Sequence, residues 1–368
     1  YHAVYGGAHA EAVALNNAGA EAGGSTLYCN LEPCSFTAED KHNGPCTTKI
    51  IEAGIKRVVI GQPDPNPRVR GQGIRQLREA GIEVELAPAV PDLEKIWYEN
   101  ARFNTVHSLN RVFVSLKLAQ SLDGRIATDT GDSKWITDRT AREGAHKLRA
   151  EHDAVLVGIK TVLSDNPRLT VRLPQDAAGT QTSSPQAVVL DAYAQIPEGF
   201  YLVQKRPEHL LVYIADPAPA GPPPAGGIRS GPMKDREKRI ASLRAAGVRV
   251  RPVGSDQEGR LSLPEILADL KEEGFQSVMV EGGAQIVTAF LQQRLFDALH
   301  LFIAPALIGD DGKAIGPLGV GKISEALRLE GTSCRQAGSG FEISGFREGW
   351  LEEITQAIEE ELYVHRAY

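Results

Sequence analysis

Short apolar runs alternate with helical stretches along most of this chain, and several of the helical stretches end at a glycine. The first hundred residues predict helices at 9–22, 46–53 and 71–80, followed in turn by strands at 26–31, 56–60 and 82–86. Gly54 and Gly81 each stand between a helix and a strand, where glycine commonly ends a helix. This order needs helical crossovers between strands, so it predicts a mostly parallel sheet covered by helices.

A second α/β series follows a connecting helix that we expect over residues 92–106. Its strands are predicted at 112–118, 154–157, 187–190, 210–214, 248–250 and 277–280, and the Pro- and Gly-rich segment 216–231 is predicted to be a loop. Near the C-terminus, an apolar helical face needs a partner in this chain or another; it consists of Leu351, Ile354, Ile358 and Leu362. The sequence thus predicts α/β domains over 1–106 and 107–347 and a helical tail over 348–368.

The composition narrows the classes of function. With 368 residues, 42% of them apolar and 24% charged, the chain has the make-up of a soluble globular protein of two domains. A formal net charge of −7 argues against a nucleic-acid partner, and no apolar run is long enough for a membrane span. The first residues carry no basic-then-apolar leader, so we expect a cytoplasmic location. Four cysteines, three of them close together, favour metal binding or catalysis over disulfides.

The first domain carries a His-Ala-Glu motif at 9–11 and two Pro-Cys pairs that end at Cys34 and Cys46. His-x-Glu followed by Pro-Cys is the signature of zinc deaminases, in which the Glu is not a ligand but transfers protons. Three protein ligands leave an open position for a water, whose pKa zinc lowers from 15.7 to about 7. The pattern indicates His9, Cys34 and Cys46 as ligands and Glu11 as the catalytic group. Cys46 opens a predicted helix, where backbone N–H dipoles favour a thiolate.

Other interpretations of these residues stay open. Eleven residues separate the two cysteines, rather than the two of the signature, although a loop of that length still lets both bind one ion. His42, within that loop, is available as a fourth ligand, which would make the site a closed structural one. A surface His-x-Glu with cysteines that merely pack is the plainest alternative. Cys29 and Cys334 are predicted to be buried packing residues.

The second domain carries polar motifs at the ends of predicted strands. They are the turn at 121–124, the segment 133–137 before a helix capped at Thr137 or Asp138, and the polar loop at 165–172. Gly282 and Gly283 join a strand to a helix, which lets a phosphate approach the free N–H groups of the helix start. They do not form the G-x-G-x-x-G fingerprint, so the standard dinucleotide-binding fold is not indicated and a plain structural turn stays open.

Taken together, these motifs resemble the bifunctional deaminase–reductase family of bacterial riboflavin biosynthesis, up to about Phe346. The resemblance rests on an ordered set of motifs at 9–11, 32–35, 64–67, 121–124, 135–137, 165–167 and 280–283. It implies a cytidine-deaminase-like α/β/α domain followed by a dihydrofolate-reductase-like α/β domain. It also implies two reactions on a phosphoribosylamino-pyrimidine, namely zinc-dependent removal of the 2-amino group and NADPH-dependent reduction of the ribosyl group to ribityl. The implied partner is this small phosphorylated substrate, and a homo-oligomer stays open.

Position by position, the resemblance implies the same zinc ligands, His9, Cys34 and Cys46, and Glu11 as the proton donor. The positions that match NADP contacts are Ala119, Trp135, Thr161, Asp165 and Gly283. The positions that match substrate contacts are Ser133, Arg149, Leu169, Arg172 and Glu281. We expect Arg149 and Arg172 each to fork onto the substrate phosphate and Trp135 to pack on a flat group of the cofactor. Asp165 and Glu281 are expected to orient the sugar and the nicotinamide, with the proton donor left unassigned.

Two departures from the family pattern lead to further expectations. Phe36 stands where the family has a His soon after the first cysteine, and the following loop is longer. We expect Lys41 and His42 of that loop to contact the substrate phosphate. The family also has a helix and a β-hairpin before the His-x-Glu helix, whereas this chain starts at Tyr1. We therefore expect an N-terminally truncated deaminase with weakened zinc binding and poor turnover, beside an intact reductase.

Two other functions stay open on the sequence alone. A nucleoside or nucleotide deaminase with a regulatory second domain would release ammonia without consuming NADPH. A non-enzymatic, zinc-stabilised binding protein would saturate its zinc with protein ligands and leave no open position.

Overall fold

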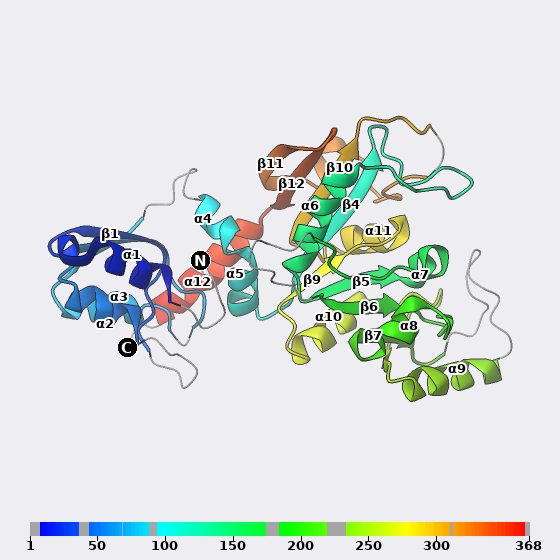
Figure 1. Ribbon diagram of the computed structural model, residues 1–368, viewed down its shortest axis with the longest axis horizontal. Helices are drawn as coiled ribbons and strands as arrows, with labels where there is room; N and C mark the ends of the chain where they lie inside the picture. Colours follow the sequence, from blue (N-terminus) through cyan, green and yellow to red (C-terminus); the bar gives the residue numbers. More distant parts are fainter. Residues whose placement is uncertain are drawn as a thin grey trace. The chain divides into compact units, whose positions relative to one another are not determined.

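The computed structural model describes residues 8–36, 44–67, 69–87, 94–173, 184–218, 233–309 and 312–364. The chain divides into two compact units (Figure 1). Unit 1 combines Tyr1–Asn110 with the C-terminal segment Gly349–Tyr368, and unit 2 is Arg111–Glu348. Unit 1 is therefore formed by two separate stretches of the chain, and unit 2 is formed by the stretch between them.

Unit 1 is built on a parallel sheet of β1 (Thr26–Leu31), β2 (Arg57–Gln62) and β3 (Glu83–Leu86), in that order. Its helices are α1 (Ala10–Ala18), a 3-10 turn at Gly19–Ala22, α2 (Cys46–Glu52), α3 (Gln72–Glu79), α4 (Glu94–Glu99), α5 (Ala101–Ser108) and α12 (Trp350–Val364). Parallel neighbours need a crossover, and α2 and α3 supply the two that join these strands. The core between sheet and helices includes Leu15, Ile50, Val58, Ile60 and Leu77.

The C-terminal helix α12 packs on α5 and completes unit 1. Trp350, Ile354 and Ile358 are buried, and the Trp350 indole N–H donates to Thr105 Oγ1 over 3.2 Å. Farther along the helix, the Ile358 carbonyl accepts from Arg70 Nη1 over 3.2 Å. The amphipathic face expected from the sequence thus has its partner within this chain.

The described part of unit 2 is built on nine strands. They are β4 (Phe113–Ser121), β5 (Ala154–Gly158), β6 (Gln186–Leu190), β7 (Leu210–Ala215), β8 (Arg249–Val253), β9 (Ser277–Val280), β10 (Ala298–Ala304), β11 (Leu329–Ala337) and β12 (Gly340–Arg347). Their order in the sheet is β11-β12-β10-β4-β9-β5-β6-β7-β8. All neighbours from β10 to β8 are parallel, whereas β12 pairs antiparallel with both β10 and β11, so a hairpin extends one edge.

Helices cover both faces of this sheet (Figure 1). They are α6 (Arg139–Ala150), α7 (Ile159–Asp165), α8 (Tyr201–Lys205), α9 (Met233–Ala245), α10 (Leu263–Glu272) and α11 (Ala284–Gln292), with 3-10 turns at Pro207–His209 and Ile323–Glu325. Successive strand residues point to opposite faces, so Val155 packs in one apolar cluster and Leu156 in the other, and neither is exposed. A sheet buried on both faces explains the continuous apolar runs of the central strands.

Several elements differ from their predictions. The expected connecting helix is two helices, α4 and α5, because Asn100 between them adopts φ −97° and ψ 14°. The hairpin of β11 and β12 was not predicted, and neither was β10. Cys334 lies in the edge strand β11 and is exposed, so its predicted burial is wrong, while Cys29 in β1 is half-buried beside the core of unit 1. Within the ranges described above, no helix combines the length and apolar character that crossing a membrane requires.

Candidate active sites

Three segments of unit 1 bring the predicted zinc ligands together. His9 is the N-cap of α1, Cys34 follows β1, and Cys46 is the first residue of α2. Cys34 Sγ lies 3.6 Å from His9 Nδ1 and accepts from the Cys46 backbone N–H over 3.4 Å. Glu11, in the first turn of α1, accepts from the Cys46 thiol at 3.7 Å. The four side chains that the sequence singled out thus form one cluster.

The donor set of this cluster fits a zinc ion. The ligand atoms of His9, Cys34 and Cys46 all lie within 4.8 Å of one another. A tetrahedral zinc with bonds of about 2.0–2.3 Å would hold its ligand atoms about 3.3–3.8 Å apart. The 3.6 Å between Cys34 Sγ and His9 Nδ1 matches this spacing. One imidazole and two sulfurs leave a fourth position open, and the Glu11 carboxylate lies beside the cluster.

The protein groups around Cys46 do not by themselves favour a thiolate. Hydrogen bonding to Cys34, then burial and the charge of Glu11, raise the pKa of the Cys46 thiol. The expectation that the N–H groups at the start of α2 favour a thiolate there stays a prediction, because a bound metal ion would lower this pKa. Ionisation of this thiol needs a cation beside it, as metal ligation supplies.

Glu32, two residues before Cys34, is buried and joins the Pro-Cys segment to the start of α3. Its two carboxylate oxygens accept backbone N–H groups at 2.9–3.2 Å from Asp64, Gly71, Gly73 and Ile74. A carboxylate in this position satisfies N–H groups that a helix start otherwise leaves unpaired. A Cβ at Gly73 would lie 2.2 Å from the Pro33 carbonyl oxygen, so this close approach requires glycine.

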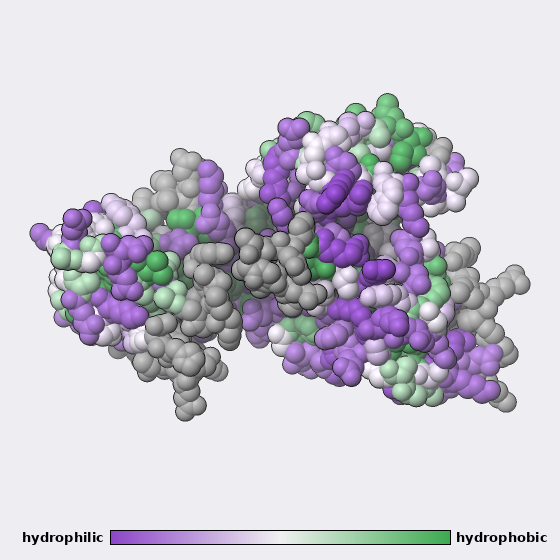
Figure 2. Space-filling model, in the orientation of Figure 1, coloured by the Kyte–Doolittle hydropathy of each residue, from purple (hydrophilic) through white to green (hydrophobic). Residues whose placement is uncertain are grey.

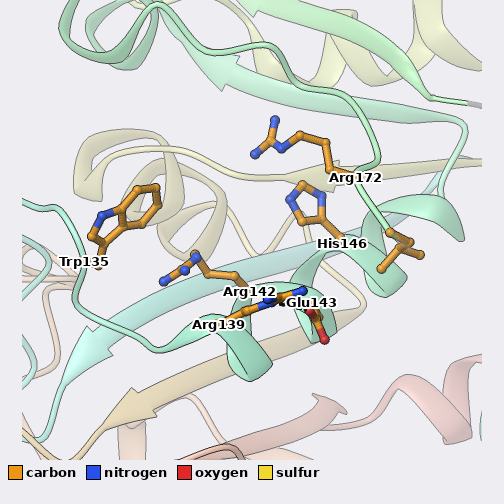
Figure 3. A pocket seen from close by; sticks show the side chains of 7 residues that line it. Trp135, Arg139, Arg142, Glu143, His146 and Arg172 are labelled. Carbon is orange, nitrogen blue, oxygen red and sulfur yellow. Dashed lines mark hydrogen bonds and ion pairs between the residues drawn. The ribbon is translucent and has the colours of Figure 1, made fainter. Parts of the chain in front are cut away.

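Unit 2 has a cavity of about 530 Å³ along one face of α6 (Figure 3). The helix presents Arg139, Arg142, Glu143 and His146 to it, while Trp135 comes from the preceding loop and Arg172 from the segment after α7. Strongly hydrophilic side chains gather over α6 on the face shown in Figure 2. The Arg142 guanidinium lies 4.3 Å from the centroid of the Trp135 ring, which is 72% exposed. The cavity is therefore basic, with an aromatic edge.

The start of α6 is fixed by Asp138, one of the two predicted caps. Its Oδ1 accepts from the Ala141 N–H over 2.9 Å, and its Oδ2 accepts from the backbone N–H and hydroxyl of Ser339 over 2.6 and 2.9 Å. Ser339 belongs to the turn between β11 and β12. One carboxylate thus ties the helix that lines the cavity to the hairpin at the sheet edge.

Arg149, at the end of α6, forms an ion pair with Glu281 after β9. Its Nε and Nη2 donate to the two Glu281 carboxylate oxygens, each over 2.8 Å, and its Nη1 donates to the Thr170 carbonyl over 2.6 Å. Burial raises the pKa of Glu281, but Arg149 and Lys117 outweigh it and bring that pKa to about 2. The expected fork of Arg149 onto a phosphate is therefore corrected, because Glu281 occupies this fork.

Sequence reasoning missed two groups beside this pair. Burial lowers the pKa of Lys117 on β4, which Glu281 and Arg149 also influence. Burial, followed by the charges of Arg149 and Arg172, lowers the pKa of His146 to about 4, so its imidazole is neutral at pH 7. His146 Nδ1 is buried and has no hydrogen-bond partner among the described residues. The helical spacing of His146 from Arg149 is the signal that could have found it.

The residues matched to cofactor contacts lie at several elements of unit 2. Gly283 is the N-cap of α11 and leaves the N–H groups of that helix start without a side-chain cap. A Cβ on Gly283 would lie 3.9 Å from Thr161 Oγ1, so α7 and α11 approach each other there. Ala119 lies in β4 opposite Phe302 of β10, and Asp165 is exposed at the end of α7, where it accepts from Ser164 Oγ over 2.9 Å.

The remaining predicted residues are placed as follows. Ser133 is exposed in the loop before Trp135, and Arg172 is exposed at the cavity. Leu169 is buried in the core with a left-handed φ of 50°. Lys41 and His42 lie outside the described residues, so their expected contact with a phosphate stays a prediction, as does the effect of elements before Tyr1.

The two units match two family models. Residues 2–62 match the cytidine and deoxycytidylate deaminase zinc-binding region, and residues 112–343 match the RibD C-terminal domain. Fold and sites together therefore define a two-domain protein with a zinc-type deaminase domain followed by a RibD-type C-terminal domain.

Individual relatives agree with these models over most of the chain. The riboflavin biosynthesis protein RibD of Aquifex aeolicus is 37% identical over 330 residues, which is 89% of this chain and 82% of the relative. That of Bacillus amyloliquefaciens is 41% identical over 308 residues, 84% of this chain and 75% of the relative. The structure of Acinetobacter baumannii RibD matches with a TM-score of 0.72 at 30% identity, over 94% of this chain and 87% of that one. The chain belongs to the RibD family of riboflavin biosynthesis proteins.

Membership confirms the predicted family, the α/β fold class and the predicted function. The chain is a bifunctional enzyme of riboflavin biosynthesis, with deaminase and reductase activities and with zinc and NADPH as its cofactors. It acts on small molecules. The deaminase with a merely regulatory second domain and the non-enzymatic binding protein are thereby set aside.

Proposed function

We propose that this chain carries out two consecutive steps on one phosphorylated pyrimidine. Unit 1 hydrolyses the 2-amino group of a diaminohydroxyphosphoribosylaminopyrimidine, and unit 2 reduces the ribosyl group of the product to ribityl. The observation that carries the proposal is the presence, in one chain, of the His9, Cys34 and Cys46 cluster and of the basic cavity on α6. A Thermotoga maritima structure whose name gives a deaminase and a reductase matches 94% of this chain and 86% of its own, at 31% identity and a TM-score of 0.67.

In the deamination step, His9, Cys34 and Cys46 would hold zinc, which would lower the pKa of a water molecule to about 7. Glu11 would accept a proton from the water that attacks C2 of the pyrimidine ring and would pass this proton to the 2-amino nitrogen. The C2–N bond would break, ammonia would leave, and C2 would keep the oxygen as a carbonyl while the second proton of the water passes to the ring nitrogen. The position of the Glu11 carboxylate, 3.7 Å from the Cys46 sulfur, supports this role because it lies beside the ligands without being one of them.

In the reduction step, NADPH bound to unit 2 would supply the hydride that C1′ of the ribosylamine accepts. The C1′–O4′ bond breaks and O4′ takes a proton, which leaves an open-chain ribityl group. The donor of this proton is left unassigned; Lys117, whose pKa burial lowers, is a charged group that interacts with Glu281 and Arg149. Glu281, with a pKa of about 2, stays ionised and does not donate this proton itself.

The other residues of unit 2 bind the two reactants in this proposal. The start of α11 at Gly283, with Thr161 beside it, receives a cofactor phosphate, and the exposed Trp135 ring covers a flat cofactor group. Arg172 binds the substrate phosphate. The residues that line the rest of the two subsites are Ala119, Ser133, Asp165 and Leu169. A homo-oligomer and a cytoplasmic location belong to the same proposal.

A coupled assay tests the proposal. The zinc-loaded protein is mixed with the diaminopyrimidine substrate and NADPH, and ammonia release and NADPH oxidation are followed together. We expect ammonia release first and NADPH oxidation after it. A zinc chelator should stop both signals, and addition of the deaminated intermediate should then restore NADPH oxidation alone. Ammonia without NADPH oxidation would point to a deaminase alone, and neither signal would contradict both steps.

A further inference from the structure

Each cysteine of the metal cluster is followed by a residue that contacts the same side chain of α3, Gln76. Its Nε2 donates to the carbonyl of Ser35, the residue after Cys34, over 3.2 Å. Its Oε1 accepts from the hydroxyl of Thr47, the residue after Cys46, over 2.8 Å. A single amide therefore bridges the two cysteine-bearing segments, although 11 residues of chain separate the cysteines.

The chemistry of the three partners allows only one arrangement of this bridge. A backbone carbonyl only accepts, so the Ser35 oxygen must face the amide nitrogen of Gln76. The amide oxygen is then directed to Thr47, whose hydroxyl donates to it. Thr47 is 0% exposed, so water does not compete for this hydroxyl. A second direct bond joins the same segments, from the Thr47 N–H to the Cys34 carbonyl over 3.2 Å.

The helix that carries Gln76 is itself fixed to the first cysteine segment. Glu32 accepts the N–H groups of Gly73 and Ile74 over 2.9 and 3.2 Å, and Gly73 lies against the Pro33 carbonyl. Gln76 thus extends from a helix whose start cannot shift relative to Cys34. The bridge connects this helix to the Cys46 segment as well, so one side chain of α3 contacts both cysteine segments.

We propose that Gln76 is a positioning residue of the metal site, which sets the separation of the Cys34 and Cys46 sulfurs through Ser35 and Thr47. The inference rests on the proposed ligand set of the deaminase step. Partners that orient metal ligands commonly change metal affinity by about 10- to 100-fold when they are removed. Loss of the bridge should therefore weaken zinc binding more than it weakens the fold.

The test measures zinc affinity of the full chain by competition with a chromophoric chelator, and the absorption spectrum of the Co²⁺-loaded protein. Gln76→Met keeps the length of the side chain and removes both hydrogen bonds. Arg75→Met, at the exposed neighbouring position of the same helix, is the matched control. We expect a 10- to 100-fold higher zinc Kd and altered Co²⁺ bands for Gln76→Met, and wild-type values for Arg75→Met.

Thr47→Val removes the hydroxyl that donates to Gln76 and keeps the volume of the side chain nearly unchanged. If the bridge acts as a unit, the double variant Gln76→Met, Thr47→Val should bind zinc about as weakly as either single variant. Unfolding temperatures of the metal-free variants separate this effect from a general loss of stability. A lower unfolding temperature with an unchanged zinc Kd would overturn the inference.

The His9→Ala variant separates the inference from the proposed ligand set. Weak zinc binding in His9→Ala together with a wild-type Kd in Gln76→Met would overturn the role of Gln76 and leave the ligand set intact. Failure of the wild-type chain to bind one zinc ion would overturn both. Weak binding in both variants, with Arg75→Met unchanged, is the result that the bridge predicts.

Discussion

The Arg149 guanidinium donates from two of its nitrogens to the two carboxylate oxygens of Glu281, each over 2.8 Å. The two side chains are only 10% and 14% exposed, so neither charge is well hydrated. Removing one partner of such a buried pair costs about 3–5 kcal/mol, because the other charge stays buried without compensation.

We therefore expect Glu281→Gln to lower the stability of unit 2 by about 3–5 kcal/mol and to abolish NADPH oxidation. Denaturant unfolding and the reductase assay measure the two effects. Glu143→Gln is the matched control. Glu143 pairs with Arg139 on α6, the helix that also carries Arg149, but the Arg139 side chain is 82% exposed. An exposed ion pair contributes about 0–1 kcal/mol to stability. An equal loss of stability in both variants would therefore show that burial does not make the Arg149–Glu281 pair more important.

Arg172 is predicted to bind the substrate phosphate from its position at the α6 cavity. Arg172→Ala should raise the reductase KM by about 10- to 100-fold, since a hydrogen bond to a charged group contributes about 1.5–3 kcal/mol. With a dephosphorylated substrate, wild type and variant should have similar KM values. Arg168→Ala is the control, because Arg168 is a nearby arginine whose guanidinium lies over the Tyr201 ring. The same KM change with both substrates would exclude a phosphate contact.

Asp191, fully buried at the end of β6, should make the stability of unit 2 depend on pH. Its Oδ2 accepts the N–H groups of Gln195 and Ile196, while burial raises its pKa to about 6. An aspartate in the unfolded chain has a pKa of about 3.9. The raised pKa of Asp191 therefore contributes stability below about pH 4, and this contribution is lost as the pH rises through about 6.

Asp191→Asn removes this titration. From pH 4 to pH 7.5, the stability of the variant should therefore improve relative to wild type, by up to about 3 kcal/mol. Chemical denaturation at both pH values gives the comparison, and Glu198→Gln, an exposed carboxylate of the same unit, should show no such trend. A difference between Asp191→Asn and wild type that stays constant with pH would refute the prediction.

Trp350, at the start of α12, should stabilise unit 1 although it comes from the far end of the chain. Its side chain is 0% exposed, lies 5.7 Å from the Tyr98 ring centre to centre, and donates to Thr105. Trp350→Ala should cost about 3–5 kcal/mol, as for other large buried side chains. Calorimetry should show a lower temperature for the transition that zinc stabilises. Glu352→Gln, on the exposed side of α12, should leave this transition temperature unchanged. An equal shift in both variants would mean that the buried Trp350 side chain is not what stabilises unit 1.

The zinc cluster and the buried strands could be predicted because their signals are local. β1 and β9 begin and end at the predicted residues, 26–31 and 277–280, since apolar runs bounded by turn residues determine them. His9, Glu11, Cys34 and Cys46 were singled out because few chemistries need those residue types in that order.

The cavity on α6 could not be predicted in the same way. Charged residues at helical spacing, such as Arg139 and Arg142, are typical of a solvated helix face. Arg149 finds its partner Glu281 across 132 residues of chain, a distance that no periodicity encodes. The strand β11 escaped prediction because, as an exposed edge strand, it lacks the apolar alternation of a half-buried one.

The central claim, two independent catalytic sites in one chain, is tested most directly with Glu11→Gln. Ammonia release from the diaminopyrimidine substrate and NADPH oxidation on the deaminated intermediate are measured for variant and wild type. We predict that ammonia release falls by at least about 100-fold, the usual contribution of a general acid–base, while NADPH oxidation keeps its wild-type rate. Ammonia release within a few-fold of wild type, or an equal loss of both activities, would contradict the claim.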